Sequence, residues 1–128
     1  MQRERYNQFT AQIIGCAMEV HKQLGPGLLE SAYMKCLRYE LESKNISFTT
    51  EQILPLKYKG SEKIGVYYMD FLIEDHIVLE IKSVEAIHEI HRAQLLTYMK
   101  IGNYKLGLIL NFNVKIMKDG IHRYVNRF

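Results

Sequence analysis

The sequence predicts an α/β fold of the α+β type, in which helices flank a mixed β-sheet. Residues 1–45 carry apolar side chains at helical spacing, whereas the chain from residue 46 onward carries runs typical of strands. Two of these runs, 77–82 and 106–112, are separated by a helical segment, which is the pattern of a right-handed parallel crossover. The strands before the crossover are joined by short turns and should be antiparallel, so the predicted sheet is mixed.

The first part of the chain predicts two helices. In each, apolar residues at steps of three and four form one stripe. The first helix ends at Gly25-Pro26-Gly27, and the second ends at Lys44-Asn45. The first stripe consists of Tyr6, Phe9, Ile13, Ala17, Val20 and Leu24, and the second of Leu29, Ala32, Tyr33, Cys36, Leu37 and Leu41. Two amphipathic helices of this kind fit the flanks of the predicted sheet.

Strands joined by turns are expected next. The chain is extended over 46–58, where Pro55 indicates an edge strand or a bulge. A turn at Lys59-Gly60-Ser61 leads into a strand at 64–73, which is rich in aromatic and β-branched residues. The polar turn Glu74-Asp75-His76 then returns the chain, so this strand forms a hairpin with the next one.

The remaining chain predicts the centre of the sheet and its last strands. Residues 77–82 form a near-continuous apolar run, typical of a buried central strand, and 106–112 form another. Between them, helical spacing is carried by Ile87, Ile90, Gln94, Leu95, Tyr98 and Met99. A final hairpin is expected over 114–125, around the turn signal Asp119-Gly120. The predicted order is α, α, β, β, β, α, β, β, β.

Length and composition indicate one globular domain. The chain has 128 residues, of which 48% are hydrophobic and 24% charged, and this composition argues against disorder. A net charge of +3 is compatible with nucleic acid without indicating it. Two cysteines are too few for a disulfide scaffold or a four-cysteine zinc site. No apolar run approaches the ~20 residues of a membrane helix, and no signal peptide is visible, so we expect a cytoplasmic protein without membrane contact.

Three charged residues interrupt the apolar strands, and such exceptions mark candidate sites. Asp70 lies inside the strand 64–73, while Glu80 and Lys82 share one face at the end of 77–82. If the hairpin is centred on Asp75, Asp70 and Glu80 oppose each other with Cβ atoms ~5 Å apart. Opposed like charges are destabilising, and a divalent cation would offset the repulsion. Two convergent carboxylates are a natural ligand set for Mg²⁺ or Mn²⁺.

The pattern leaves two alternatives open at this point. A two-residue turn would place Asp70 opposite Ile81 and weaken the carboxylate pair. Alternatively, Lys82 pairs with Glu80 or Asp70 in a buried salt bridge without any metal. Against the salt bridge stands the position of the trio at the carboxyl end of a central strand, where open sheets place ligand sites.

Glu30 and Gln94 are further candidates. Glu30 lies in the first turn of the second helix, where a carboxylate stabilises a helix by ~0.5 kcal/mol. It also shares a helical face with Tyr33 at the edge of the buried stripe. Gln94 lies on the apolar face of the third helix, where it is expected either to bond a strand end or to orient a water, Lys82 or a phosphate.

These residues resemble the motifs of a known family. Residues 27–33 match Gly-x-x-Glu-x-x-Tyr, and Asp70, Glu80-Ile81-Lys82 and Gln94-Leu95-Leu96-Thr97-Tyr98 follow in order. Together they resemble the GxxExxY proteins of the PD-(D/E)XK nuclease-like superfamily, over almost the whole chain. Met69 stands where a proline often precedes the motif aspartate, and many members of the superfamily dispense with that proline.

The resemblance implies a restriction-endonuclease-like αβββαβ core, spanning 1–128 as a single domain, and metal-dependent hydrolysis of nucleic-acid phosphodiester bonds. The implied catalytic residues are Glu30, Asp70, Glu80, Lys82 and Gln94. Glu30, Asp70 and Glu80 would hold Mg²⁺ or Mn²⁺, Lys82 would lie beside the attacking water, and Gln94 would support them. DNA rather than RNA is the implied partner. Because the chain has no separate DNA-reading domain, a homodimer, another protein partner or non-specific phosphate contacts would bring in the substrate.

Two rival interpretations remain. A catalytically silent nuclease-fold module would serve nucleic-acid binding or protein assembly. Such a module is expected to lose Asp70, Glu80 or Lys82, and none is lost. His88-Glu89-Ile90-His91 differs in spacing from the His-Glu-x-x-His motif of zinc proteases. These histidines are therefore expected at the start of the third helix, near solvent or phosphate.

Overall fold

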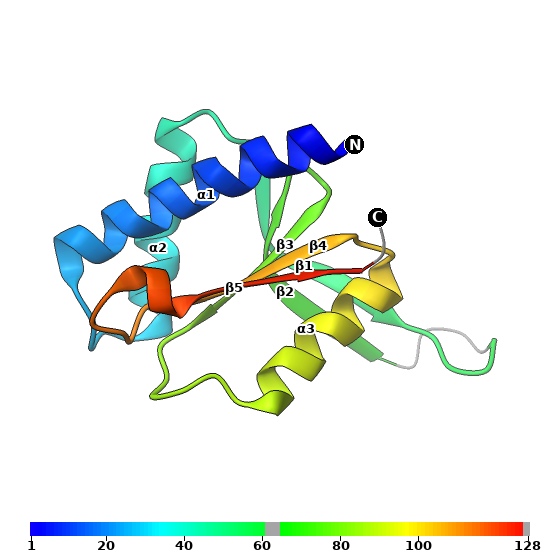
Figure 1. The fold of residues 1–128 in the computed structure, drawn as a ribbon. Coiled ribbons are helices and arrows are strands. Elements are labelled where there is room, and N and C mark those ends of the chain that lie inside the picture. The colour runs from blue at the N-terminus through cyan, green and yellow to red at the C-terminus, as the bar shows by residue number, and fades with distance from the viewer. Residues whose placement is uncertain (61–64, 127–128) are drawn as a thin grey trace.

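The computed structural model describes residues 1–60 and 65–126 of the 128-residue chain. Figure 1 shows a twisted sheet with helices on both of its faces. In chain order, the described elements are α1 (Arg3–Leu24), α2 (Glu30–Ser43), β1 (Phe48–Leu56), β2 (Gly65–Ile73), β3 (Ile77–Lys82), α3 (Glu89–Gly102), β4 (Leu106–Asn111), the 3₁₀ helix η1 (Met117–Gly120) and β5 (Ile121–Val125). Ser61 and Ile64, which the sequence assigns to a turn and to a strand start, lie outside the described residues.

The strands form one sheet in the order β1-β2-β3-β4-β5. The β3–β4 pair is parallel and is connected through α3, whereas the other neighbouring pairs are antiparallel. The predicted mixed sheet is thus confirmed. β3 is the middle strand, as its apolar run predicts, and β1, which contains Pro55, is an edge strand.

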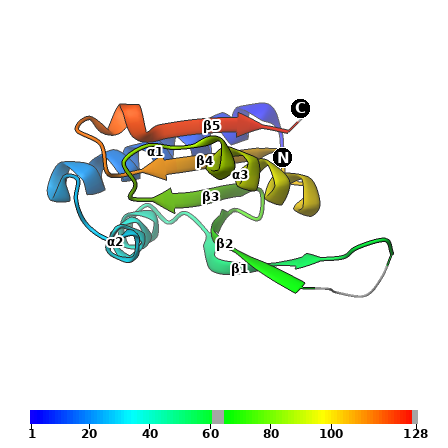
Figure 2. The same ribbon diagram turned by 90° about the horizontal axis from the view of Figure 1, so that it is seen from below.

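The two faces of the sheet have separate hydrophobic cores. Helices α1 and α2 cover one face, and α3 covers the other (Figures 1 and 2). In β3, Leu79 and Ile81 belong to the core under α1 and α2, whereas Val78 belongs to the core under α3. Because side chains alternate along a strand, Glu80 and Lys82 are placed on the face of α3.

The β1–β2 hairpin exchanges its two faces halfway along its length. In β2, Phe71 packs in the core under α1 and α2, but Met69 packs in the core under α3. Residues two apart in a regular strand share a face, so β2 turns over at Asp70. In β1, Glu51 has a φ of 51° and drops out of the pairing with β2 at the same level. Beyond this point the hairpin bends away from the rest of the sheet (Figure 2).

The predicted final hairpin over 114–125 is wrong. Bends and η1 precede β5, and β5 pairs with β4 instead of with a preceding arm. Tertiary contacts are the cause of this difference. Met117 is buried in the core under α1 and α2, and the ring of His21 in α1 donates a hydrogen bond to the Val114 carbonyl oxygen at 2.7 Å. These contacts hold the segment against the helices, so it does not pair as a strand.

The third helix is confirmed, but its buried face differs from the predicted one. Ile87 precedes the helix, and Ile90 in its first turn is 71% exposed. The buried residues of α3 are Leu95, Tyr98 and Met99. Only the later turns of α3 therefore pack on the sheet, and the first turn extends into solvent.

Candidate active site

Two carboxylates take the place of backbone pairing between β2 and β3. The last ladder pair is Phe71 with Leu79, which is the register of a hairpin centred on Asp75. At the next step, the Asp70 N–H donates to Glu80 Oε2 at 2.9 Å, and the Ile81 N–H donates to Asp70 Oδ2 at 2.8 Å. The two acidic side chains therefore lie next to each other where β2 turns over. We call Asp70 and Glu80 the acidic pair.

The acidic pair is costly to ionise. Glu80 is 6% exposed. Burial, followed by the charge of Asp70, raises the pKa of Glu80 from 4.5 to about 8. Burial also raises the pKa of Asp70, although the hydrogen bond from Ile81 opposes the shift. Carboxyl groups with perturbed pKa values cluster at functional sites, which makes this pair the strongest candidate in the fold.

Lys82 supplies positive charge next to the acidic pair. It ends β3, two residues after Glu80 on the same face, and it is half-buried. Its charge lowers the pKa of both Asp70 and Glu80. Within the described part of the chain, ion pairs join Arg38 to Glu42 and Arg92 to Glu89, and none joins Lys82 to either carboxylate. The salt bridge considered as an alternative is therefore not formed in this structure.

Glu30 reaches the end of β3 from α2. Its Oε2 accepts a hydrogen bond from the Ser83 N–H at 3.2 Å, and the Ser83 hydroxyl donates to the Leu28 carbonyl oxygen at 2.5 Å. The charge of Glu30 also raises the pKa of both members of the acidic pair. Glu30 thus acts electrostatically on the same site, although its carboxylate is held by the backbone after Lys82.

Tyr33 fixes the loop that precedes Glu30, a role that its place in the apolar stripe does not reveal. The Tyr33 hydroxyl donates to the Gly25 carbonyl oxygen at 2.6 Å and accepts from the Leu28 N–H at 3.2 Å. Its ring stacks on Phe112 with centroids 4.6 Å apart. Gly25 and Gly27 have φ values of 68° and 103°, which favour glycine. The glycines and Tyr33 together set where α2, and with it Glu30, begins.

Gln94 is exposed, so its predicted place on a buried face is wrong. The side chain of Gln94 is hydrogen-bonded to Tyr98, one turn later in α3. Burial, followed by the charge of Glu80, raises the pKa of Tyr98, and Asp70 contributes in the same direction. Gln94 is therefore linked to the acidic pair through Tyr98.

Asn111 is a buried polar residue that the sequence analysis did not single out. It is 2% exposed and pairs with Lys82 at the end of β4. Its amide donates to the Val84 carbonyl oxygen at 3.0 Å, and its Oδ1 accepts from the Val84 and Asn113 N–H groups. Asn111 thereby holds the loop after Lys82. Its position at the end of an apolar strand was the signal that could have found it.

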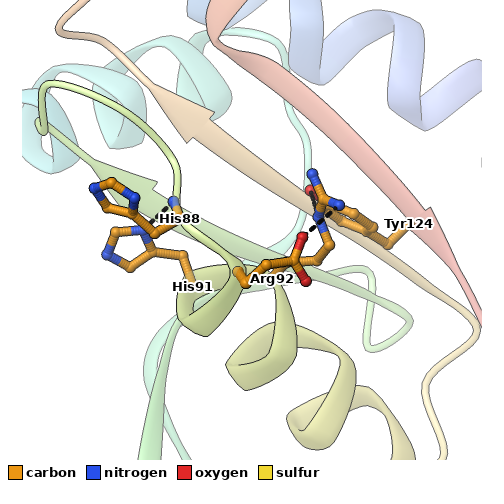
Figure 3. A network of polar contacts seen from close by, with 5 residues as sticks. His88, His91, Arg92 and Tyr124 are labelled. Carbon is orange, nitrogen blue, oxygen red and sulfur yellow. Dashed lines mark hydrogen bonds and ion pairs between the residues drawn. The ribbon is translucent and has the colours of Figure 1, made fainter.

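His88, which precedes α3, and His91, in its first turn, cap the helix. The His88 N–H donates to His91 Nδ1 at 3.0 Å, and the His88 side chain accepts from the His91 N–H in return. Arg92 bonds the Tyr124 hydroxyl at 3.1 Å and Glu89 at 3.0 Å (Figure 3). The histidines thus lie at the helix start, as expected, and capping accounts for their spacing.

The donor set fits a hard divalent cation in its chemistry, but the side chains are not gathered in coordinating positions. Over residues 1–60 and 65–126, no group of three or more His, Cys, Asp or Glu side chains is arranged to hold a metal ion. The hydrogen bonds of the described residues engage one oxygen each of Asp70 and Glu80. Each carboxylate therefore has its second oxygen for a ligand, and carboxylate oxygens suit Mg²⁺ and Mn²⁺.

Fold and site together define a nuclease-like α+β domain, with an acid on each of two neighbouring strands and a lysine at the end of the central one. A model of the PD-(D/E)XK nuclease superfamily matches residues 7–124. The chain belongs to the PD-(D/E)XK nuclease superfamily. No curated protein matches the chain. Among the described helices, none is both long and apolar enough to cross a membrane.

Proposed function

We propose that this protein is a divalent-metal-dependent nuclease that hydrolyses phosphodiester bonds, with DNA preferred over RNA. The observation that carries the proposal is the acidic pair, with Glu80 buried and Asp70 half-buried, whose carboxyl groups resist ionisation and lie beside the positive charge of Lys82. The negative charge of the ionised acidic pair is energetically costly in the free protein, and a bound cation would offset this cost. The Gly-x-x-Glu-x-x-Tyr motif at 27–33 supports placing the protein, within this proposal, in the GxxExxY group of the superfamily.

Each residue has a distinct role in the proposed mechanism. Glu30, Asp70 and Glu80 would hold Mg²⁺ or Mn²⁺, which supplies positive charge to the scissile phosphate and lowers the pKa of the attacking water. Lys82 stabilises the negative charge that develops on the phosphoryl oxygens. Gln94, bonded to Tyr98, orients groups at the edge of the site. The Ser83 N–H engages Oε2 of Glu30, so Oε1 is the oxygen that Glu30 would offer to the cation.

The experiment is degradation of single- and double-stranded DNA and RNA with Mg²⁺ or Mn²⁺, using purified protein and two variants. Lys82→Ala should retain Mn²⁺-induced stabilisation but lose ~100-fold or more in rate, because Lys82 stabilises charge without ligating the ion. Glu80→Ala should lose both. Lys118→Ala, at an exposed lysine of η1, is the matched control and should cut like the wild type.

Two outcomes would contradict the proposal. Wild-type protein that cuts nothing with either metal would favour the silent module, or a protein that needs a second copy or another partner to act. Cutting that survives in both the Lys82→Ala and Glu80→Ala variants would identify a contaminating nuclease.

A further inference from the structure

An exposed tyrosine lies against Tyr98 on the face of α3. Tyr67 in β2 is 44% exposed, and its ring centroid lies 5.5 Å from that of Tyr98. Tyr98 in turn is close enough to Glu80 and Asp70 for their charges to raise its pKa, after the larger effect of burial. Tyr67 therefore lies one aromatic ring away from the acidic pair, with an aromatic surface open to solvent.

A groove lies beside the cross-strand neighbour of Tyr67. Leu54, the cross-strand partner of Tyr67, lines a groove of about 530 Å³ between β1 and the end of α3. This volume falls inside the ~300–1,000 Å³ range of ligand pockets. Ile101 and Tyr104 form the opposite wall, and the exposed Lys57 lies at the hairpin side. The surface thus runs from two acids, past a tyrosine ring, to an apolar groove with a cation.

The chemistry of this surface suits an unpaired nucleotide. A base of any identity can stack on an exposed aromatic ring, and a lysine further along can contact phosphate. In a regular duplex the faces of the bases are covered by their neighbours, so a ring such as Tyr67 has no base face to contact there. The turnover of β2 at Asp70 is what places Tyr67 on the side of the acidic pair.

We infer that Tyr67 stacks on an unpaired base and that the groove with Lys57 holds the adjoining backbone, so that the substrate class is single-stranded nucleic acid. That the bound nucleic-acid strand runs toward the acidic pair rests on the proposed function. The binding of the strand to Tyr67 and the groove does not. Single-stranded DNA and RNA share the base faces and phosphates that this surface would contact. The test distinguishes the two.

The test is binding without cleavage. Fluorescence anisotropy with the whole chain in EDTA measures affinity for labelled oligothymidylate, oligouridylate and duplex DNA of matched length. Single strands should bind more tightly than the duplex. Tyr67→Ala should weaken single-strand binding about tenfold, whereas Tyr67→Phe, which keeps the ring, should bind like the wild type. Lys57→Ala should lower the affinity and reduce the salt dependence by about one phosphate contact.

The adjacent Tyr68 provides the matched control. It is 56% exposed but points to the opposite face of the hairpin, so Tyr68→Ala should leave binding unchanged. Three outcomes would overturn the inference. They are an equal loss of single-strand affinity in Tyr67→Ala and Tyr68→Ala, tighter binding of duplex than of single strands, and no binding to any of the three probes. Binding as expected without cleavage by any metal would uphold it while refuting the nuclease. Cleavage of single strands by Tyr67→Ala at the wild-type rate would refute the inference while upholding the nuclease.

Discussion

Replacing Glu80 with glutamine should stabilise the metal-free protein, and the gain should depend on pH. The pKa of Glu80 is raised from 4.5 to about 8 in the folded chain. Between these values the folded state therefore binds more protons than the unfolded state, so the free energy of unfolding falls as pH rises. Glutamine is neutral throughout, and its side-chain oxygen can still accept the Asp70 N–H. Glu80→Gln removes the charge without removing this hydrogen bond.

The size of the stability gain in Glu80→Gln follows from the pKa shift of Glu80. One pKa unit corresponds to about 1.4 kcal/mol, so ionising Glu80 across the whole range costs at most about 5 kcal/mol. Relaxation around the ionised side chain reduces this cost, and we expect a gain of roughly 2–4 kcal/mol at pH values above the raised pKa. Below the ordinary pKa of 4.5 the two proteins should be equally stable.

Urea unfolding of wild type and Glu80→Gln in EDTA, repeated from acidic to alkaline pH, measures this difference directly. A gain that stays constant with pH would refute the linkage to Glu80 ionisation. A Glu80→Gln protein less stable than the wild type at high pH would show that the carboxylate is stabilised by Lys82, which is the salt-bridge interpretation.

The same two proteins test the metal site. With Mn²⁺ at about a hundred times its dissociation constant, the wild type should gain ~2.7 kcal/mol of stability by mass action. Glu80→Gln should gain little, because it has lost a ligand. Equal stabilisation of the two proteins would show that Glu80 does not bind the ion.

Four further predictions concern stability, each measured by urea unfolding. Tyr33→Phe should cost about 1–2 kcal/mol, because the Leu28 N–H and the Gly25 carbonyl lose their partner; an unchanged midpoint would contradict the anchoring role. Asn111→Ala should cost about 2–3 kcal/mol, since it leaves the backbone of the loop after Lys82 without its bonds. Gly120→Ala should cost at least ~2 kcal/mol, because a Cβ there would lie 2.0 Å from the Asn111 carbonyl oxygen. Gly15→Ala, at an exposed helical glycine with nothing within 4 Å, should instead stabilise by ~0.5–1 kcal/mol.

Local signals sufficed for the centre of the fold. The apolar run of β3 has the predicted bounds, and the short turn around Asp75 gives the register that aligns Asp70 with Glu80. Both follow from residues close in sequence, because strand periodicity and turn length need no knowledge of distant contacts. The identity of the acidic pair was predictable for the same reason.

Features that depend on distant contacts were not predictable. The segment before β5 is held by His21 and by the core under α1 and α2, contacts that no local pattern encodes. Gln94 was expected on a buried face because spacing alone cannot tell that the first turn of α3 lies beyond the sheet. The turnover of β2 at Asp70 breaks the alternation on which strand predictions depend, so the side to which Tyr67 points could not be derived either.

This turnover also explains how the acidic pair, with Glu80 buried and Asp70 half-buried, is tolerated at the centre of the sheet. Where a strand turns over, the backbone N–H groups of Asp70 and Ile81 lose their regular ladder partners, and buried N–H groups must find acceptors. The two carboxylates are those acceptors, at 2.9 and 2.8 Å. Apolar residues at both positions would leave these N–H groups without partners, while neutral polar residues would keep the bonds and lose the charge. Backbone geometry therefore accounts for oxygen acceptors at these positions, and the choice of two acids is what the proposed cation-binding function would require.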